Sequence, residues 1–149
     1  MGEDLPPATG GDGEVDAGVR LRLEREFGLP AVRDEAPCKD LVDWLSRYLA
    51  GDPGRFEGKL DLGRGTDFQR RVWEEVWRIP YGEVRSYGWI AERVGSPNGQ
   101  RAVGQANGAN PIPLAIPCHR VIRSDGQLGG YTCGLGLKER LLAREKARS

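Results

Sequence analysis

SYGWIAERVGSPNGQRAVGQANGAN, residues 86–110, predicts two short helices separated by a turn. Ser86 is a favourable N-cap for the first helix, and Gly95 marks its end. The apolar face of this first helix consists of Ile90, Ala91 and Val94. The second helix follows within residues 97–110 and is polar on most sides. Two short helices joined by a turn that contains glycine have the outline of a helix-turn-helix.

The second helix is built mostly from small residues. They are Ala102, Gly104, Ala106, Gly108 and Ala109. So little side-chain bulk allows the helix backbone to lie close to another surface. That surface is either a neighbouring helix, as in many helical hairpins that do not touch DNA, or a groove of DNA with Arg101 on the exposed side. Taken alone, the pattern favours packing against a helix.

An amphipathic helix is predicted before this pair, in GTDFQRRVWEEVWRIPYGE, residues 65–83. Thr66 and Gln69 have the spacing of a capping box, and Pro80 ends the helix. Apolar residues recur every four positions at Phe68, Val72 and Val76. This spacing places them on one face, which predicts a helix packed against a core.

The first 65 residues divide into four parts. Residues 1–18 carry almost no apolar side chains, so we expect a disordered arm. The next segment, AGVRLRLEREFGL, fits either a short strand or the start of a helix. CKDLVDWLSRYLAG predicts a helix that ends at Gly51. Its apolar face consists of Leu41, Trp44, Leu45 and Leu49. Residues 51–65, rich in glycine, are then expected to form a linker.

The segment after Asn110, NPIPLAIPCHRVIRSDGQLGGY, changes in character. Its prolines, Pro111, Pro113 and Pro117, favour an extended chain that presents Cys118 at its end. VIRSDGQL predicts a hairpin with its turn at Asp125 and Gly126 and with Val121 and Ile122 on one arm. A closing helix follows in GLGLKERLLAREKARS. Its core-facing positions are Leu137, Leu141 and Leu142, with Glu145 on the same side.

Cys118 and His119, the sole histidine, form the strongest candidate for chemistry. A thiol becomes a good nucleophile only as the thiolate, which requires a base or a positive neighbour. Neighbouring side chains of an extended segment point to opposite sides, so a bend or a bridging water would be needed. Glu145 is a candidate to hold the imidazole in one tautomer. The competing interpretation of Cys118 is a buried small hydrophobic residue.

Composition and charge limit the class of protein. The chain has 149 residues, enough for one sizeable domain or two small ones. Its three cysteines show neither a disulfide framework nor a zinc-knuckle spacing, which favours a reduced, intracellular protein in the cytoplasm. No apolar run is long enough to span a membrane.

Charge is divided unevenly along the chain. Residues 1–63 contain 8 Lys and Arg against 14 Asp and Glu, and residues 64–149 contain 14 Lys and Arg against 8 Asp and Glu. A basic half is compatible with binding of nucleic acid, but ordinary solvated surfaces of proteins that bind no nucleic acid have the same charge balance.

The sequence contains, in this order, the motifs RAVGQANGAN, NPIP, IPCHRVI and GGY. Their combination resembles the O6-alkylguanine-DNA alkyltransferase (methylated-DNA–protein-cysteine methyltransferase) family. The resemblance covers about the last 85 residues. It implies direct-reversal DNA repair: an O6-alkylguanine, chiefly O6-methylguanine and in some cases O4-methylthymine, is flipped out of the duplex. The alkyl group then moves irreversibly to Cys118, so each molecule acts once.

The resemblance also implies roles for the other residues of the catalytic site. His119 and Glu145 correspond to members of a relay that withdraws the thiol proton through a water molecule. Asn110 corresponds to an asparagine that braces the turn at the site. Tyr87 corresponds to a tyrosine near the target phosphate and base, which helps to protonate the leaving guanine.

Substrate and DNA contacts are implied in the same way. The base pocket is expected to include Tyr131, Thr132, Pro113 and Val121. Arg101 corresponds to the arginine that enters the base stack where the guanine has left. The other DNA-contacting residues would be Gln100, Ala102, Gly104 and Tyr87. The partner is double-stranded DNA bound through its minor groove, the protein is expected to be a monomer, and no cofactor or metal is required.

We therefore predict an α+β protein with a short, divergent N-terminal domain and a mainly helical C-terminal domain that carries a winged helix-turn-helix-like motif. The expected boundaries are 1–18 for the arm, 19–63 for the reduced N-terminal domain and linker, and 64–149 for the DNA-binding and transfer domain. Some relatives bind zinc in the first domain, but this half has only Cys38 and no histidine. Cys133, beside the expected pocket, is a candidate to tune the size of accepted alkyl groups.

Two alternatives belong to other functional classes. The first is an alkyltransferase-like protein that binds the lesion without transferring its alkyl group. Such proteins typically lack the cysteine, so Cys118 argues against this alternative. The second is a small hydrolase with a cysteine and histidine pair, in which the helix pair is only scaffold. The absence of a nucleophile elbow and the basic second half count against the hydrolase.

Overall fold

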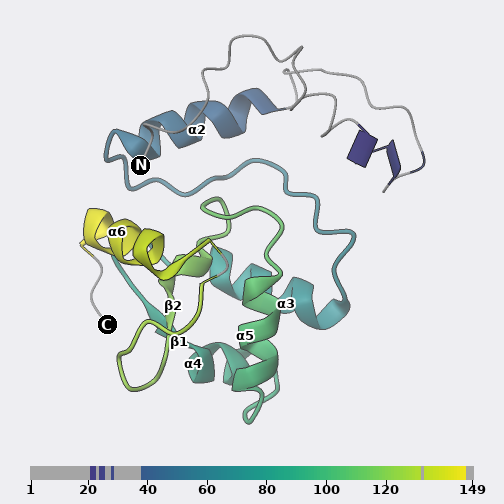
Figure 1. The fold of residues 1–149 in the computed structure, drawn as a ribbon, viewed down its shortest axis with the longest axis vertical. Coiled ribbons are helices and arrows are strands. Elements are labelled where there is room, and N and C mark those ends of the chain that lie inside the picture. The colour runs from purple at the N-terminus through teal and green to yellow at the C-terminus, as the bar shows by residue number, and fades with distance from the viewer. Residues whose placement is uncertain (1–20, 23, 26–27, 29–37, 132, 147–149) are drawn as a thin grey trace. The chain divides into compact units, whose positions relative to one another are not determined.

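The computed structural model describes residues 21–22, 24–25, 28, 38–131 and 133–146 (Figure 1). The chain forms two units, which divide between Cys38 and Lys39. In the first unit, the described residues Leu21, Arg22, Glu24 and Arg25 are helical. Of the two structures predicted for AGVRLRLEREFGL, these residues therefore adopt the helix and not the strand. The arm predicted over residues 1–18 lies outside the described residues.

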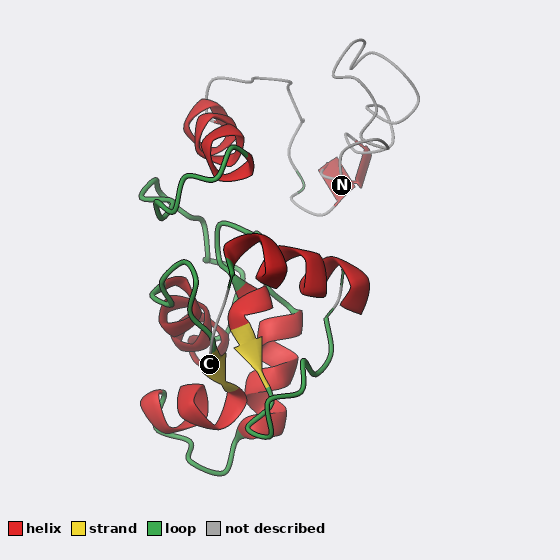
Figure 2. Ribbon diagram, turned by 90° about the vertical axis from the view of Figure 1, so that its left-hand side faces the viewer, coloured by secondary structure: helices red, strands yellow, loops and turns green. Residues whose placement is uncertain are grey.

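The second unit is mainly helical with one small sheet, in agreement with the predicted α+β class (Figure 2). Its elements are α2 (Lys39–Leu49), α3 (Asp67–Trp77), β1 (Arg85–Ser86), α4 (Tyr87–Arg93), α5 (Gln100–Gly108), the 3₁₀ turn η2 (Cys118–Arg120), β2 (Val121–Ile122) and α6 (Leu135–Glu145). The helices predicted from apolar spacing are therefore all present in this unit.

Helices α3, α4 and α5 enclose the larger apolar core. The capping box is confirmed, because Thr66 Oγ1 accepts from Gln69 N at 3.1 Å and Gln69 Oε1 accepts from Thr66 N at 2.9 Å. The buried side chains of this core include Val72, Val76, Ile90, Val103 and Ile116. The indole of Trp73 donates to the carbonyl of Ala106 at 2.7 Å and so joins α3 to α5.

Helix α5 packs through one edge and leaves the other exposed. Val103, Ala106 and Asn107 are buried. Gln100, Arg101, Ala102 and Gln105 are exposed. The packing interpretation is thus correct for the buried edge alone, and the exposed edge is free to meet another molecule. Ser86 caps α4 by accepting from Trp89 N at 3.0 Å, and Gly95 after that helix has φ +79°.

The predicted hairpin is wrong in its strand pairing. Val121 and Ile122 form β2, but β2 pairs in parallel with β1, in the register Arg85 to Val121 and Ser86 to Ile122. The turn itself is present: Gly126 has φ +85°, and Arg123 N donates to the Gln127 carbonyl at 2.8 Å. The second arm does not pair because the carbonyls of Leu128 and Gly130, just after the turn, accept hydrogen bonds from the Lys138 ammonium instead.

The segment expected to be extended before Cys118 is a compact turn. Proline fixes only its own φ, and Leu114 between two prolines adopts φ +75°. Ile116 N then donates to the Ile112 carbonyl at 3.0 Å. Cys118 begins a 3₁₀ turn, so the rule that neighbouring side chains of a strand point apart does not hold here.

The expected linker contains no helix or strand, but it is packed. Phe56 is buried and meets the Trp44 ring edge-on, with centroids 5.8 Å apart. Its carbonyl accepts from the Trp77 indole at 2.9 Å. A second apolar cluster therefore includes α2, the linker and α6, with Trp44, Tyr48, Phe56, Ala115 and Leu141 at its centre.

Candidate active site

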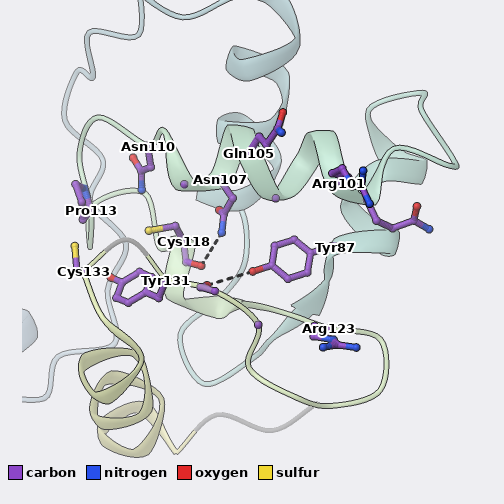
Figure 3. A pocket seen from close by; sticks show the side chains of 15 residues that line it. Tyr87, Arg101, Gln105, Asn107, Asn110, Pro113, Cys118, Arg123, Tyr131 and Cys133 are labelled. Atoms are coloured by element: carbon purple, nitrogen blue, oxygen red, sulfur yellow. Dashed lines mark hydrogen bonds between the residues drawn. The ribbon is translucent and has the colours of Figure 1, made fainter.

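A cavity of about 800 Å³ lies between α5, the turn that follows it and the segment before α6 (Figure 3). Its lining includes Tyr87, Arg101, Asn110, Pro113, Cys118 and Tyr131. These residues come from separate parts of the sequence, and the fold brings most of the predicted site together around one opening. The exposed edge of α5 forms one rim of this opening.

Cys118 lies at the inner wall of the cavity. It is 4% exposed, and its carbonyl accepts from the Asn107 side chain at 3.1 Å. Burial raises the pKa of its thiol, although hydrogen bonds from Asn110 and Tyr131 oppose this change. The thiol is consequently protonated at neutral pH, and its nucleophilicity depends on a base that removes the proton.

His119 and Glu145 lie behind Cys118, away from solvent. His119 Nε2 and Glu145 Oε2 are 2.7 Å apart, and both side chains are fully buried. Burial opposes the charge on Glu145, but hydrogen bonds from His119 and Arg120 outweigh it and lower the pKa of the carboxyl to about 2. Burial lowers the pKa of His119. A neutral imidazole beside a carboxylate must donate from Nε2, so its Nδ1 lone pair is able to accept a proton.

Two further residues hold the Glu145 carboxylate, and the sequence did not indicate either of them. Arg120 donates from Nε to Oε1 at 2.7 Å and from Nη2 to Oε2 at 3.0 Å. The Tyr48 hydroxyl, on α2, donates to Oε2 at 2.7 Å. Tyr48 lies one turn beyond Trp44, a spacing that indicates only a core position. Because Glu145 receives several donors, its position and charge are fixed.

Asn110 braces the turn before the nucleophile. Its Nδ2 donates to the Ile116 carbonyl at 2.8 Å, and its Oδ1 accepts from Ile112 N at 2.9 Å. The same side chain therefore holds both ends of the turn. The part that Asn110 plays in the reaction stays a prediction.

Tyr87 lies across the cavity at the start of α4. Its hydroxyl donates to the Gly130 carbonyl at 3.5 Å. Burial and the charge of the Cys118 thiolate raise the pKa of Tyr87, so the phenol keeps its proton. Gly129 has φ +70°, and a Cβ there would lie 3.0 Å from the Tyr87 ring, so this position requires glycine.

Lys138 on α6 is a buried cation that sequence reasoning missed. Its Nζ donates to the carbonyls of Val121 at 2.7 Å, Leu128 at 2.5 Å and Gly130 at 3.3 Å. Burial lowers its pKa to about 8, and the nearby Cys118 thiolate acts in the opposite direction. A lysine within the amphipathic pattern of a closing helix is usually solvated, so the sequence offered no signal.

The remaining predicted residues differ in position. Gln100, Arg101 and Gly104 line the cavity, and Ala102 is exposed on α5 outside this lining. Pro113 and Tyr131 line the cavity as well. Val121 is fully buried in the apolar core and is not among the lining residues. Thr132 lies outside the described residues.

The described part of the chain contains neither a metal-binding cluster nor a membrane-spanning helix. No group of three or more His, Cys, Asp or Glu side chains there is placed to hold a metal ion. None of the helices described is both long enough and apolar enough to cross a membrane.

Comparisons with known proteins agree with this geometry. Residues 67–147 match the family model for the 6-O-methylguanine DNA methyltransferase, DNA binding domain. The methylated-DNA–protein-cysteine methyltransferase of Mycobacterium tuberculosis is 46% identical over 147 residues, which covers 97% of this chain and 88% of the relative. A crystal structure of the M. tuberculosis protein in complex with DNA aligns with a TM-score of 0.69 at 54% identity, over 72% of this chain and 65% of that chain. The archaeal relative from Pyrococcus kodakaraensis aligns with a TM-score of 0.62 at 26% identity, over 88% of this chain and 76% of that chain. The chain therefore belongs to the methylated-DNA–protein-cysteine methyltransferase family.

Proposed function

We propose that Cys118 accepts the alkyl group of an O6-alkylguanine that has been flipped out of duplex DNA. Family membership makes the chain a DNA repair methyltransferase that acts by direct reversal. The observation that carries the assignment to Cys118 is its place at the inner wall of the cavity, directly before the buried His119 and Glu145 pair. Methyl transfer from O6-methylguanine is the principal reaction.

The chemical step needs three groups. His119 Nδ1 takes the thiol proton through one water molecule, and Glu145 stabilises the imidazolium that forms. The Cys118 sulfur then attacks the alkyl carbon, the bond between carbon and O6 breaks, and the guanine gains negative charge. Tyr87 donates a hydrogen bond or its proton to the leaving guanine. The resulting thioether has no further route back to a thiol, so each molecule acts once.

DNA binding is assigned to α4 and α5, as the two helices of a winged helix-turn-helix-like motif in residues 64–149. The exposed edge of α5 combines the small side chain of Ala102 with the polar side chains of Gln100, Arg101 and Gln105, which suits contact within the minor groove. Contacts in the minor groove distinguish the base pairs poorly, which suits a protein that must repair lesions in any DNA sequence. Residues 19–63 are assigned to a reduced N-terminal domain and linker.

Arg101 is expected to occupy the space in the base stack that the flipped guanine leaves. The Arg101→Ala variant should therefore repair a lesion in duplex DNA about tenfold more slowly, a loss of about 1.4 kcal/mol, because extrusion of the base costs a few kcal/mol. Its reaction with a free O6-alkylguanine base should keep the wild-type rate. Single-turnover rates with the two substrates provide the measurement.

Arg140→Ala is the control for Arg101, because it removes the same charge from an exposed position on α6 outside the cavity. It should slow neither reaction. An Arg101→Ala variant that loses equal activity on duplex and free base would show that Arg101 has no part in flipping.

Lys138 is expected to hold the loop that carries Tyr131. In Lys138→Met three carbonyls lose their donor, and leaving buried acceptors unsatisfied costs about 1–3 kcal/mol of unfolding free energy. The exposed Lys39→Met should stay within about 0.5 kcal/mol of wild type. Denaturant unfolding measures both variants, and equal stability of the two would mean that the ammonium does not support the loop.

Counting repaired lesions per protein molecule tests the proposed function against its alternatives. The protein should be titrated against duplex DNA that contains one O6-methylguanine. We expect repair to stop at one lesion per molecule. Binding without repair would instead indicate a lesion-binding protein, and repeated turnover of an ester or peptide without DNA would indicate a hydrolase.

A further inference from the structure

A second thiol lines the cavity that holds Cys118. Cys133 is exposed, and neither cysteine forms a disulfide. Figure 3 shows the two sulfur atoms on the same side of the cavity, with the Tyr131 hydroxyl pointing between them. Both thiols act on the pKa of the Tyr131 phenol, which places both sulfurs close to this one side chain. The established reaction uses one acceptor, so the second thiol is unexplained.

The two thiols differ in how far they lie from solvent. Cys118 is buried, whereas Cys133 is exposed on the segment that leads into α6. A group attached to Cys118 came from a guanine in the cavity and must extend towards the opening. The far end of any longer alkyl group consequently lies in the cavity that Cys133 also lines.

We propose that Cys133 is a second alkyl acceptor, which captures the far carbon of a bifunctional alkyl group already bound to Cys118. This inference rests on the proposed function, because Cys118 must first receive the group. The substrate class is an O6-alkylguanine whose alkyl chain carries a leaving group, such as a halide, on its far carbon. A plain methyl group offers no second carbon and leaves Cys133 unmodified.

The second step balances without an oxidant or reductant. The Cys133 thiol gives its proton to solvent, and its sulfur attacks the far carbon. The bond between carbon and halogen breaks, and the halide leaves with the electron pair. The product is one alkylene chain joined to both sulfurs. A carbon that could otherwise alkylate DNA is thereby consumed within the protein.

Tyr131 is well placed to assist this step. Burial and the charges of both thiolates raise the pKa of its phenol, so the hydroxyl keeps its proton and is available as a hydrogen-bond donor. An alkylene bridge is also longer than a disulfide bond, whose sulfur atoms must approach to about 2.05 Å. The bridge therefore requires less movement of the two segments than oxidation of the pair would.

The test uses the whole protein and a duplex that contains one O6-(3-chloropropyl)guanine. Trypsin cleaves after Arg101, Arg120, Arg123 and Lys138, so Cys118 and Cys133 fall in the separate peptides 102–120 and 124–138. Mass analysis should find most of the alkylated Cys118 peptide joined to the Cys133 peptide by a propylene group, with chlorine lost. An alkylated Cys118 peptide beside an unmodified Cys133 peptide would overturn the proposal.

Two variants and one second substrate separate the possible failures. Cys133→Ser should give a Cys118 peptide that carries the single chain, and Cys38→Ser should give the bridge in wild-type yield; thermal unfolding confirms that each is folded. The wild-type map decides the question even if a variant does not fold. If Cys118 accepts methyl from O6-methylguanine but no bridge forms, or no chloropropyl group is transferred, this proposal is overturned. The proposed function is unaffected by either result. If Cys118 accepts neither group, the proposed function fails as well.

Discussion

Cys118→Ser is expected to lower the rate of alkyl transfer by at least about 10⁴-fold and to leave DNA binding within about threefold of wild type. A serine hydroxyl is a far weaker nucleophile than a thiolate, and His119 cannot compensate for the difference. DNA is assigned to the exposed edge of α5, whereas Cys118 is buried at the inner wall. Single-turnover transfer and a binding titration with the same lesion duplex measure the two effects.

Cys38→Ser is the matched control, because Cys38 is exposed and does not line the cavity. It should transfer at the wild-type rate. Loss of both transfer and DNA binding in Cys118→Ser would mean that the substitution had damaged the fold. Transfer that survives in Cys118→Ser would place the acceptor at another residue.

Glu145→Gln is expected to lower the unfolding free energy by about 3–5 kcal/mol, because it leaves the buried Arg120 guanidinium without its carboxylate. Transfer should also slow by about 10²-fold or more, since the neutral amide lacks the negative charge that stabilises the charged form of His119. Denaturant unfolding and single-turnover kinetics give the two values. Glu139→Gln, at an exposed position on the same helix, should change neither.

The pH dependence of stability distinguishes the role of the Glu145 charge. Its pKa falls from the ordinary value of 4.5 to about 2 in the folded protein, so its contribution is complete above pH 4.5 and is lost as the pH falls towards 2. Burial also lowers the pKa of His119 from its ordinary value of 6.5. The stability that the neutral His119 contributes is therefore also lost as the pH falls below 6.5. Glu145→Gln should therefore flatten the stability curve between pH 4.5 and 2. A slope equal to that of wild type would show that Glu145 carries no special charge interaction.

Local signals allowed the helices to be predicted from the sequence. The capping box at Thr66, the N-cap at Ser86 and the glycine after α4 act within a few residues, so their effect does not depend on the rest of the fold. Apolar spacing worked for the same reason. The prolines before Cys118 were a weaker guide, since they left Leu114 free to turn the chain.

Contacts between distant parts of the chain could not be predicted in this way. The pairing of β1 with β2 joins two-residue strands, which are too short to show a pattern. Tyr48 reaches Glu145 across 97 positions of sequence. Lys138 is buried because three carbonyls converge on it, and nothing in its own neighbourhood indicates this.

The family resemblance supplied what the local signals could not. Adjacency of Cys118 and His119 did not indicate a working pair, and only the 3₁₀ turn with the carboxylate of Glu145 gives the imidazole a defined orientation. Its place on the closing helix already makes Glu145 a candidate, and the resemblance adds Asn110, which lines the cavity. It did not identify Arg120, which shares the carboxylate with His119.

Peptide mapping shows whether Cys118 itself receives the alkyl group. The protein should be incubated with duplex DNA that contains one O6-methylguanine, digested with trypsin and analysed by mass spectrometry. We expect peptide 102–120 to gain one methyl group on Cys118, while the peptides with Cys38 and Cys133 stay unmodified. An unmodified peptide 102–120 after the lesion has been repaired, or a methyl group on either of the other cysteines, would contradict it.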